Sequence, residues 1–138
     1  MSEYQTVGHR VIVCGGRFFA DYDAVHNALI QVHALDPNFV LVHGGAKGAD
    51  SLASTWNCAW CLGSSSEECH PADWDKYRRP KGRNPAGPIR NRAMLDAGVH
   101  LVVAFPGGTG TADMVKIAKA AGVPVWQPCT GEDMPDWL

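Results

Sequence analysis

Three short glycine-rich segments are the places where this chain could hold a phosphate. One of them, residues 107–111, reads Gly-Gly-Thr-Gly-Thr and follows Pro106 and the apolar run 101–104. Glycine lets a backbone approach a ligand closely, and a helix starting at the threonines would aim free N–H groups and a positive helix end at one point. The alternative is an ordinary tight turn. The unbroken run of small and hydroxyl-bearing residues favours phosphate binding, with Gly107, Gly108, Thr109, Gly110 and Thr111 as candidate ligand residues.

The two other glycine segments also follow apolar runs. Residues 44–50 come after the run 39–42, and Gly15-Gly16-Arg17 comes after the run 9–14. Asp50 either caps the next helix or accepts hydrogen bonds from a ribose, and Lys47 either contacts phosphate or stays solvated. Arg17 is predicted to contact a ligand rather than solvent alone. The candidates from these segments are Gly15, Gly16, Arg17, Gly44, Gly45, Lys47 and Asp50.

A basic stretch with nearby aromatic residues is the third feature. Seven lysines and arginines lie within residues 76–92. Arg90 and Arg92 open a predicted helix, where their charge opposes the helix dipole unless an anionic ligand or a carboxylate offsets it. Because they are two residues apart they point to different sides, so one is expected at the site and the other in a salt bridge. Trp74 and Tyr77 either stack on a base or anchor the loop by packing.

The apolar periodicity predicts strands alternating with helices. Apolar strands are expected at 9–14, 39–42, 67–70, 99–105 and 123–127, and helices at 21–35, 50–62, 89–97 and 111–121. This alternation predicts an α/β fold, a Rossmann-like doubly wound parallel sheet of about five strands in the order 3-2-1-4-5 with helices on both faces. All three glycine segments then lie at carboxyl ends of strands, where such sheets bind ligands. We expect one domain over 1–138, with its core at 9–127, a basic loop at 71–88 and a tail at 128–138 that is loose unless Trp137 docks.

The composition argues against several classes of protein. The formal net charge of −2 argues against a general coating of nucleic acid, and no apolar run approaches the ~20 residues of a membrane span. The start of the chain lacks a secretory signal pattern. An odd number of cysteines then predicts reduced thiols in the cytoplasm. Cys58, Cys61, Cys69 and His70 could be read as a zinc site, but buried, inert thiols are favoured, so we expect neither metal nor cofactor.

Together these segments resemble the SLOG superfamily, which is related to Smf/DprA and LOG, in its YspA/YpsA-like branch. The resemblance covers about 9–127 and is carried by Gly15–Phe19, Gly44–Asp50, Pro71–Trp74, Gly87–Arg92 and Pro106–Asp113. It implies a Rossmann-like fold with a nucleotide-derived or phosphoribosyl ligand at the strand ends. It also implies a homo-oligomer, because related proteins commonly dimerise.

The resemblance to LOG enzymes has one important departure. Those enzymes cleave the N-glycosidic bond of a nucleoside monophosphate with the motif Pro-Gly-Gly-x-Gly-Thr-x-x-Glu, in which the glutamate is catalytic. Here Met114 takes the glutamate position, while Asp113 precedes it and faces about 100° away on a helix. The resemblance therefore implies a sensor, a carrier or a weak hydrolase, with Asp113 as the candidate acid/base and, with Asp50, a candidate ribose contact. The alternative is DprA-like binding of single-stranded nucleic acid through the basic residues 76–92.

Overall fold

The five-stranded parallel sheet expected from the sequence is confirmed. The computed structural model describes residues 8–61 and 67–138. Its strands are β1 (Arg10–Cys14), β2 (Val40–His43), β3 (Glu67–Cys69), β4 (Leu101–Ala104) and β5 (Val125–Trp126). They lie in the order β3-β2-β1-β4-β5, and every neighbouring pair is parallel. The strand order therefore reverses between β1 and β4, which is where a doubly wound sheet opens a crevice.

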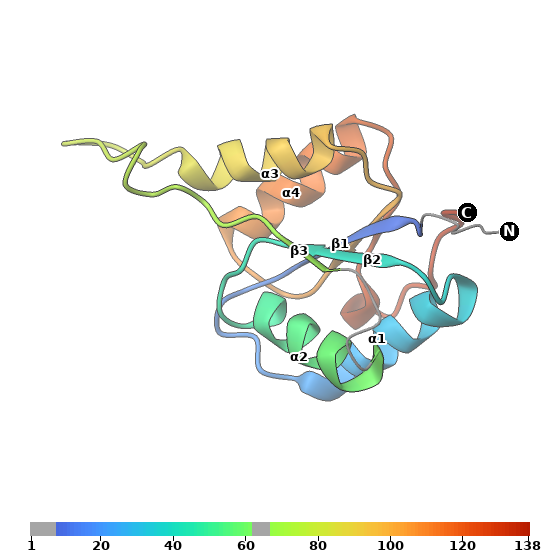
Figure 1. Ribbon diagram of the computed structural model, residues 1–138. Coiled ribbons are helices and arrows are strands. Elements are labelled where there is room, and N and C mark those ends of the chain that lie inside the picture. Colours follow the sequence, from blue (N-terminus) through green and yellow to red (C-terminus); the bar gives the residue numbers. More distant parts are fainter. Residues whose placement is uncertain (1–7, 62–66) are drawn as a thin grey trace, which may run out of the picture.

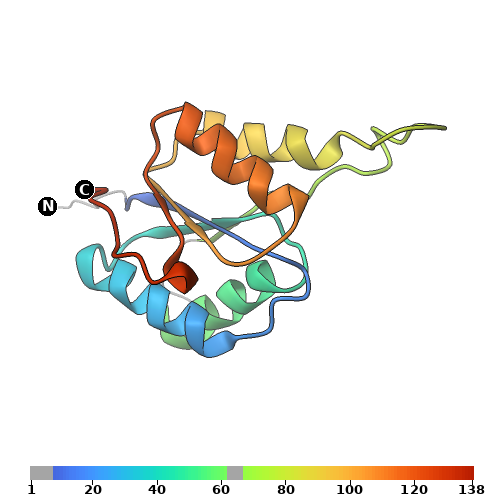
Figure 2. The ribbon, with the colours of Figure 1, turned by 180° about the vertical axis from the view of Figure 1, so that it is seen from behind.

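Helices cover both faces of the sheet. In Figures 1 and 2, α1 (Tyr22–Leu35) and α2 (Ala49–Cys61) lie on one face, and α3 (Ala86–Asp96) and α4 (Thr109–Ala120) lie on the other. Successive strand residues point to opposite faces, so Val11 packs into the core under α1 and α2 while Ile12 packs under α3 and α4. No helix of the described residues is long and apolar enough to cross a membrane.

The third strand differs from the prediction. It was expected to be apolar, but it reads Glu-Glu-Cys, and it lies at the edge of the sheet with its residues partly or fully exposed. An edge strand can be polar because one side meets solvent. Its two carboxylates have partners on β2 and β1: Glu67 lies 2.7 Å from Nε2 of His43 on the neighbouring β2, and Glu68 accepts from the guanidinium of Arg10 on β1, the next strand along.

Several helix and strand limits also shift. α3 begins at Ala86 rather than at 89, because Pro88 falls in the first turn of the helix, where a missing N–H costs nothing. α4 begins at Thr109 rather than at 111, and the fourth and fifth strands are shorter than expected. Residue 62, the predicted end of α2, lies outside the described residues.

The cysteines are not buried as expected. Cys58, Cys69 and Cys129 are exposed because they lie on the outer side of α2, on the edge strand and in the C-terminal segment, while Cys14 is partly buried. The side chain of Cys61 lies outside the described residues. In the part of the chain that is described, no three histidine, cysteine or acidic side chains gather in a way that could hold a metal ion.

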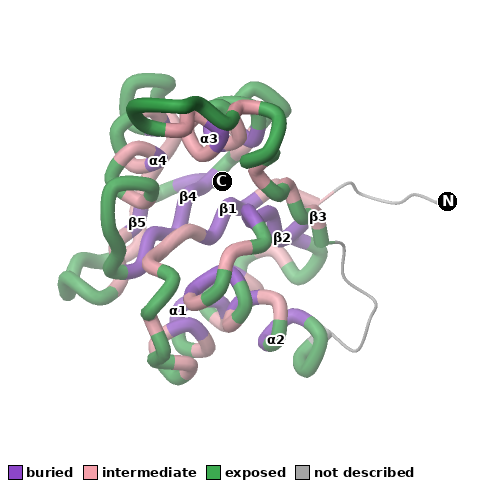
Figure 3. Tube along the Cα trace, turned by 90° about the vertical axis from the view of Figure 1, so that its left-hand side faces the viewer, coloured by how far each residue is buried: buried purple, intermediate pink, exposed green. Residues whose placement is uncertain are grey.

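The loops that build the candidate site all follow the carboxyl ends of strands and so lie at the same end of the sheet. This end is on the left in Figure 1, opposite the two chain ends, and Figure 3 views the molecule from that side. The segment 71–85 extends away from the body before the chain returns as α3, and most of its residues are exposed. The tail is partly ordered by a short 3-10 helix, η1 (Pro128–Thr130), and Trp137 docks at 8% exposure, with its ring edge-on to His9.

Candidate functional site

A cavity of about 460 Å³ lies where the strand order reverses, at the carboxyl ends of β1 and β4. Its walls come from all three glycine segments, the start of α3 and the base of the 71–85 segment. Such a volume is in the range of small-molecule sites. The topology thus brings together the segments that the sequence singled out. Of the candidates, those that line the cavity are Gly15, Gly16, Arg17, Gly44, Asp50, Trp74, Arg90, Gly108, Thr109, Gly110 and Thr111.

The N-terminus of α4 borders this cavity without a side-chain cap. Gly108 is the N-cap residue, and the first backbone hydrogen bond of the helix runs from the Ala112 N–H to the Gly108 carbonyl, at 3.0 Å. The N–H groups of the first turn have no acceptor inside a helix. A Cβ added to Gly108 or Gly110 would meet nothing within 4 Å. Free donors and open space therefore coincide at one point of the cavity wall.

The other glycines of this region are needed for packing. A Cβ on Gly107 would lie 2.2 Å from Thr111 Oγ1 and 2.6 Å from the Gly16 nitrogen. The Gly16 N–H donates to the Pro106 carbonyl at 2.8 Å. Gly48 has a φ of +83°, and a Cβ there would lie 2.1 Å from the Gly16 carbonyl oxygen. These glycines let the three turns touch one another, and they place the turns around the cavity.

The segment 44–50 has its backbone donors already occupied. Oδ2 of Asp50 accepts from the N–H of Gly44 at 3.1 Å and of Ala46 at 3.2 Å. Nδ1 of His43 accepts from the N–H of Gly45 at 3.0 Å. Asp50 thus braces the turn that precedes its helix, a role that neither sequence alternative named. This segment shapes the wall, whereas the start of α4 keeps its backbone N–H donors free.

Arg90 and Asn91 tie three loops together. Nη1 of Arg90 donates to the carbonyls of Gly44 at 2.9 Å and of His70 at 3.2 Å, and its Nε donates to Oδ1 of Asn91 at 3.1 Å. Nδ2 of Asn91 donates to the Gly110 carbonyl at 3.2 Å and to Oδ2 of Asp113 at 3.0 Å. The guanidinium of Arg90 lines the cavity, but much of its donor capacity is used on the protein. Asn91, which is only 4% exposed, was not predicted as a site residue. The one indication in the sequence was that it is a polar residue on the inner face of a predicted helix.

Two other arginines are free to meet an anion. Arg17 and Arg83 are exposed and line the cavity, and neither has an ion-pair partner among the described residues. Arg83 lies in the basic loop but was not among the candidates. Trp74 lines the same side at 51% exposure, and it packs against Gly87, where a Cβ would lie 3.3 Å from its ring. The two roles considered for Trp74, stacking and anchoring, are compatible with this position.

The floor of the cavity carries two acidic groups whose pKa values are raised. Burial, and after it the charge of Asp50, raise the pKa of the Cys14 thiol to about 12. Burial also raises the pKa of Asp50, against the effect of its two backbone donors and of the charges of His43 and Arg90. The thiol is therefore neutral at physiological pH, and Asp50 is the one acidic side chain among the described residues that line the cavity.

Five candidates do not line the cavity. Gly107 packs behind it, Lys47 and Arg92 are exposed elsewhere, and Gly45 lies on the outer side of its turn. Asp113 accepts from Asn91 and stands outside the cavity. Met114, at the position of the LOG glutamate, is fully buried in the core beneath α4. The roles of the five candidates in ligand binding stay predictions, and their positions outside the cavity do not favour them.

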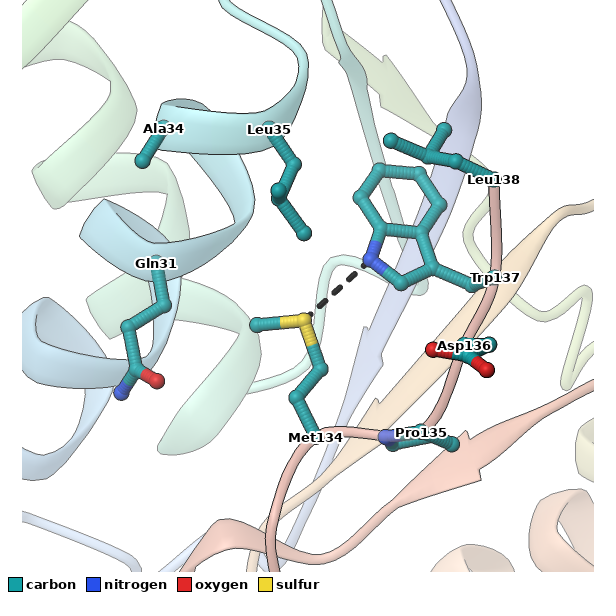
Figure 4. A pocket seen from close by; sticks show the side chains of 8 residues that line it. All are labelled: Gln31, Ala34, Leu35, Met134, Pro135, Asp136, Trp137 and Leu138. Atoms are coloured by element: carbon teal, nitrogen blue, oxygen red, sulfur yellow. Dashed lines mark hydrogen bonds between the residues drawn. The ribbon is translucent and has the colours of Figure 1, made fainter.

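A separate cavity of about 470 Å³ lies at the opposite end of the sheet. Figure 4 shows it between the end of α1 and the C-terminal residues, with Leu35 and Leu138 at its sides and Trp137 donating to Sδ of Met134 at 3.2 Å. None of the glycine segments reaches it. It is therefore not part of the candidate site.

Comparison with known proteins agrees with this architecture. Residues 9–77 match the family described as YspA, cpYpsA-related SLOG. The Gene 61 protein of Mycobacterium phage D29 is 37% identical over 123 residues, which are 84% of this chain and 93% of that protein. This chain belongs to the YspA, cpYpsA-related SLOG family. The family match includes Trp74 and the glycine segments at 15–17 and 44–50, whereas the turn before α4 lies beyond it.

A solved structure resembles this SLOG protein in fold. The X-ray structure of TM1055 has a TM-score of 0.59, with 85% of this chain and 72% of that chain covered. The sequences are 17% identical, so the likeness concerns the fold alone.

Proposed function

We propose that this SLOG protein binds a nucleotide or another phosphoribosyl-type small molecule in the cavity between β1 and β4, with the phosphate at the start of α4. The observation that carries the proposal is the uncapped N-terminus of α4, where Gly108 and Gly110 leave open space beside free N–H groups. Helix N-termini of this kind bind phosphate through their N–H groups and their positive dipole end. Membership of the SLOG family supports the same class of ligand.

The side chains around the cavity suit the rest of such a ligand. Arg17 and Arg83 supply unpaired positive charge near the phosphate position. Trp74 offers an exposed aromatic face on which a base can stack. Asp50 offers a carboxyl group that a ribose hydroxyl could contact. Lys47, Arg92 and Asp113 make no contribution in this proposal because they stand outside the cavity.

The proposal favours a sensor or carrier in the cytoplasm over an efficient hydrolase. The LOG glutamate is replaced by Met114, which is buried in the core, and Asp113 is held by Asn91. Among the described residues, that leaves Asp50 as the carboxyl group with access to a bound ligand. Any slow cleavage of an N-glycosidic bond would therefore depend on Asp50 rather than on Asp113.

Calorimetry with AMP, ribose 5-phosphate and adenosine tests the proposal. Gly108→Val is the informative variant, because an added Cβ meets nothing within 4 Å and the new side chain would occupy the open space beside the N–H groups. We expect at least a tenfold loss of affinity for AMP. Ala120→Val, at the exposed far end of the same helix, is the matched control and should bind as the wild type does. Equal affinity of both variants for AMP, or wild-type binding of adenosine but not of the two phosphates, would refute the phosphate position.

A second candidate function has one specific observation in its favour. The segment 71–85 extends from the body (Figure 1), and its residues Arg78, Arg79 and Lys81 are exposed and do not line the cavity. Single-stranded nucleic acid binds such basic segments with a strong dependence on salt. Against it, Arg78 is already paired with Asp75, and the chain as a whole is slightly acidic. A steep salt dependence of binding to an oligonucleotide would favour this second candidate.

A further inference from the structure

A second groove lies on the other side of the turn that precedes α4. It has a volume of about 590 Å³ and runs between one face of α4, the end of β4 and the residues that follow β5. Like the first cavity, it opens near the carboxyl ends of the strands, but it lies between β4 and β5 rather than at the reversal of strand order. The proposed function makes no use of it.

The lining of this groove combines positive charge with apolar surface. Lys116 and Lys119 are three residues apart on α4, so they lie on the same side of the helix. Both are exposed, and neither has an ion-pair partner in the described part of the chain. Pro106 and Val115 supply apolar surface, whereas Phe105 is buried at 2% exposure and the Thr130 hydroxyl already donates to the Gln127 carbonyl at 2.7 Å. Such a lining suits a small molecule with an anionic group on an aromatic or apolar body.

The groove is separated from the first cavity by a packed wall. Gly107 fills the space between them so closely that a Cβ there would lie 2.6 Å from the Gly16 nitrogen. One ligand therefore cannot pass through this wall. Thr111 nevertheless lines both spaces, and it belongs to the turn of α4 that offers its N–H groups to the first cavity. Occupancy of the groove would act on the same residues that shape the phosphate position.

We propose that this groove is an effector site for a small aromatic or apolar anion, which binds as a second molecule and changes the affinity of the first cavity for its nucleotide. The binding half stands on the groove alone, whereas the coupling half rests on the proposed function. Coupling of this kind is reciprocal, so the nucleotide must change the affinity for the effector by the same factor.

Cys129 makes a direct test possible, because this exposed thiol lines the groove. The probe is phenyl phosphate, with phenol as its neutral counterpart, and the measurement is the rate of alkylation of Cys129 by mass spectrometry. Cys58, exposed on α2, serves as the internal control. We expect phenyl phosphate to slow alkylation of Cys129 at least threefold and to leave Cys58 unchanged, and phenol to have a weaker effect.

Variants assign the effect to the groove. The double variant Lys116→Gln/Lys119→Gln should need at least a tenfold higher concentration of phenyl phosphate, whereas Lys47→Gln/Lys81→Gln, exposed lysines elsewhere, should behave as the wild type. Protection should persist in Gly108→Val, where the first cavity is blocked. Equal protection of both cysteines, no protection, or an unchanged response of the first double variant overturns the site. Protection of Cys129 that rises with protein concentration alone also overturns it, since a second copy then covers the groove.

The coupling is measured separately. The affinity for AMP is determined by calorimetry with and without saturating phenyl phosphate, and we expect a change of at least threefold that disappears in the Lys116→Gln/Lys119→Gln variant. Protection of Cys129 with no change in AMP affinity overturns the effector role while the site stands. Absence of AMP binding to the wild type refutes the proposed function instead, and the alkylation result still decides the groove.

Discussion

Replacing Asn91 with alanine should destabilise the protein more than its single side chain suggests. Asn91 is 4% exposed, accepts from Arg90, and donates to the Gly110 carbonyl and to Asp113. The substitution removes three hydrogen bonds that join α3 to the start of α4 and to the side chain that holds the turn after β2. It also leaves the Gly110 carbonyl and the Arg90 Nε without these partners.

The expected loss in the free energy of unfolding follows from these contacts. Three hydrogen bonds at about 1 kcal/mol each give about 3 kcal/mol. Alanine is the better helix former by about 0.6 kcal/mol, which offsets part of the loss. The free energy of unfolding should therefore fall by about 2–3 kcal/mol. For a domain of this size that corresponds to a fall in Tm of about 6–12 °C.

Urea unfolding followed by circular dichroism measures this change. Arg92→Ala is the matched control, because Arg92 follows Asn91 on the same helix, is exposed and has no hydrogen bond or ion pair among the described residues. It should change the free energy of unfolding by less than about 0.5 kcal/mol. If Asn91→Ala were no more destabilising than Arg92→Ala, the loops would not depend on the Arg90–Asn91 connection, and the reasoning would fail.

Three further outcomes are expected. The Arg10 guanidinium lowers the pKa of Glu68 from 4.5 to about 2, so their pairing stabilises the fold fully above pH 4.5 and loses its effect as the pH falls to about 2. Because the Glu68 side chain is 39% exposed, solvent screening reduces this contribution to about 1 kcal/mol. The free energies of unfolding of the wild type and of Glu68→Gln should therefore converge between pH 4.5 and pH 2. Release of adenine from AMP should be far slower than the 1–10³ per second of ordinary enzymes, because Met114 replaces the LOG glutamate; turnover within that range, measured by chromatography, would show that another group supplies the missing function. Arg83→Gln should weaken AMP binding at least threefold and Lys81→Gln should not, since of the two only Arg83 lines the cavity; equal calorimetric affinities would remove the basic loop from the site.

The order and type of the elements could be predicted because they depend on local pattern. Apolar runs separated by helical periodicity require a sheet covered on both faces, and the handedness of crossovers leaves few strand orders. The third strand is an exception because it carries two carboxylates instead of apolar side chains. The carboxylates of Glu67 and Glu68 are accommodated by His43 and Arg10, which lie on other strands. Nothing local to Glu67–Cys69 indicates those partners, so the sequence placed a strand here without showing how the sheet would accommodate two carboxylates.

The site could be predicted as a place but not in its division of roles. Gly107 and Gly108 are adjacent in sequence and identical in type, yet one packs against Thr111 and Gly16 while the other borders open space. Arg90 was a candidate ligand residue and lines the cavity, but that its partners are the carbonyls of Gly44 and His70 depends on how three loops meet. Such contacts arise from residues far apart in the chain, and spacing alone does not reveal them.

The electrostatics of the cavity explain why a phosphate should lie at α4 and not at the other glycine turn. The N–H groups of Gly44, Gly45 and Ala46 are already bound by Asp50 and His43, and the positive charge of Arg90 is directed at carbonyl oxygens. Burial raises the pKa of the Cys14 thiol to about 12, so at physiological pH the thiol adds no negative charge to the cavity floor that would repel an anion. What remains unneutralised is the positive end of α4, together with Arg17 and Arg83 in the lining of the same cavity. A phosphate placed there meets free donors and positive charge, whereas one placed at residues 44–46 would compete with Asp50 for the same N–H groups.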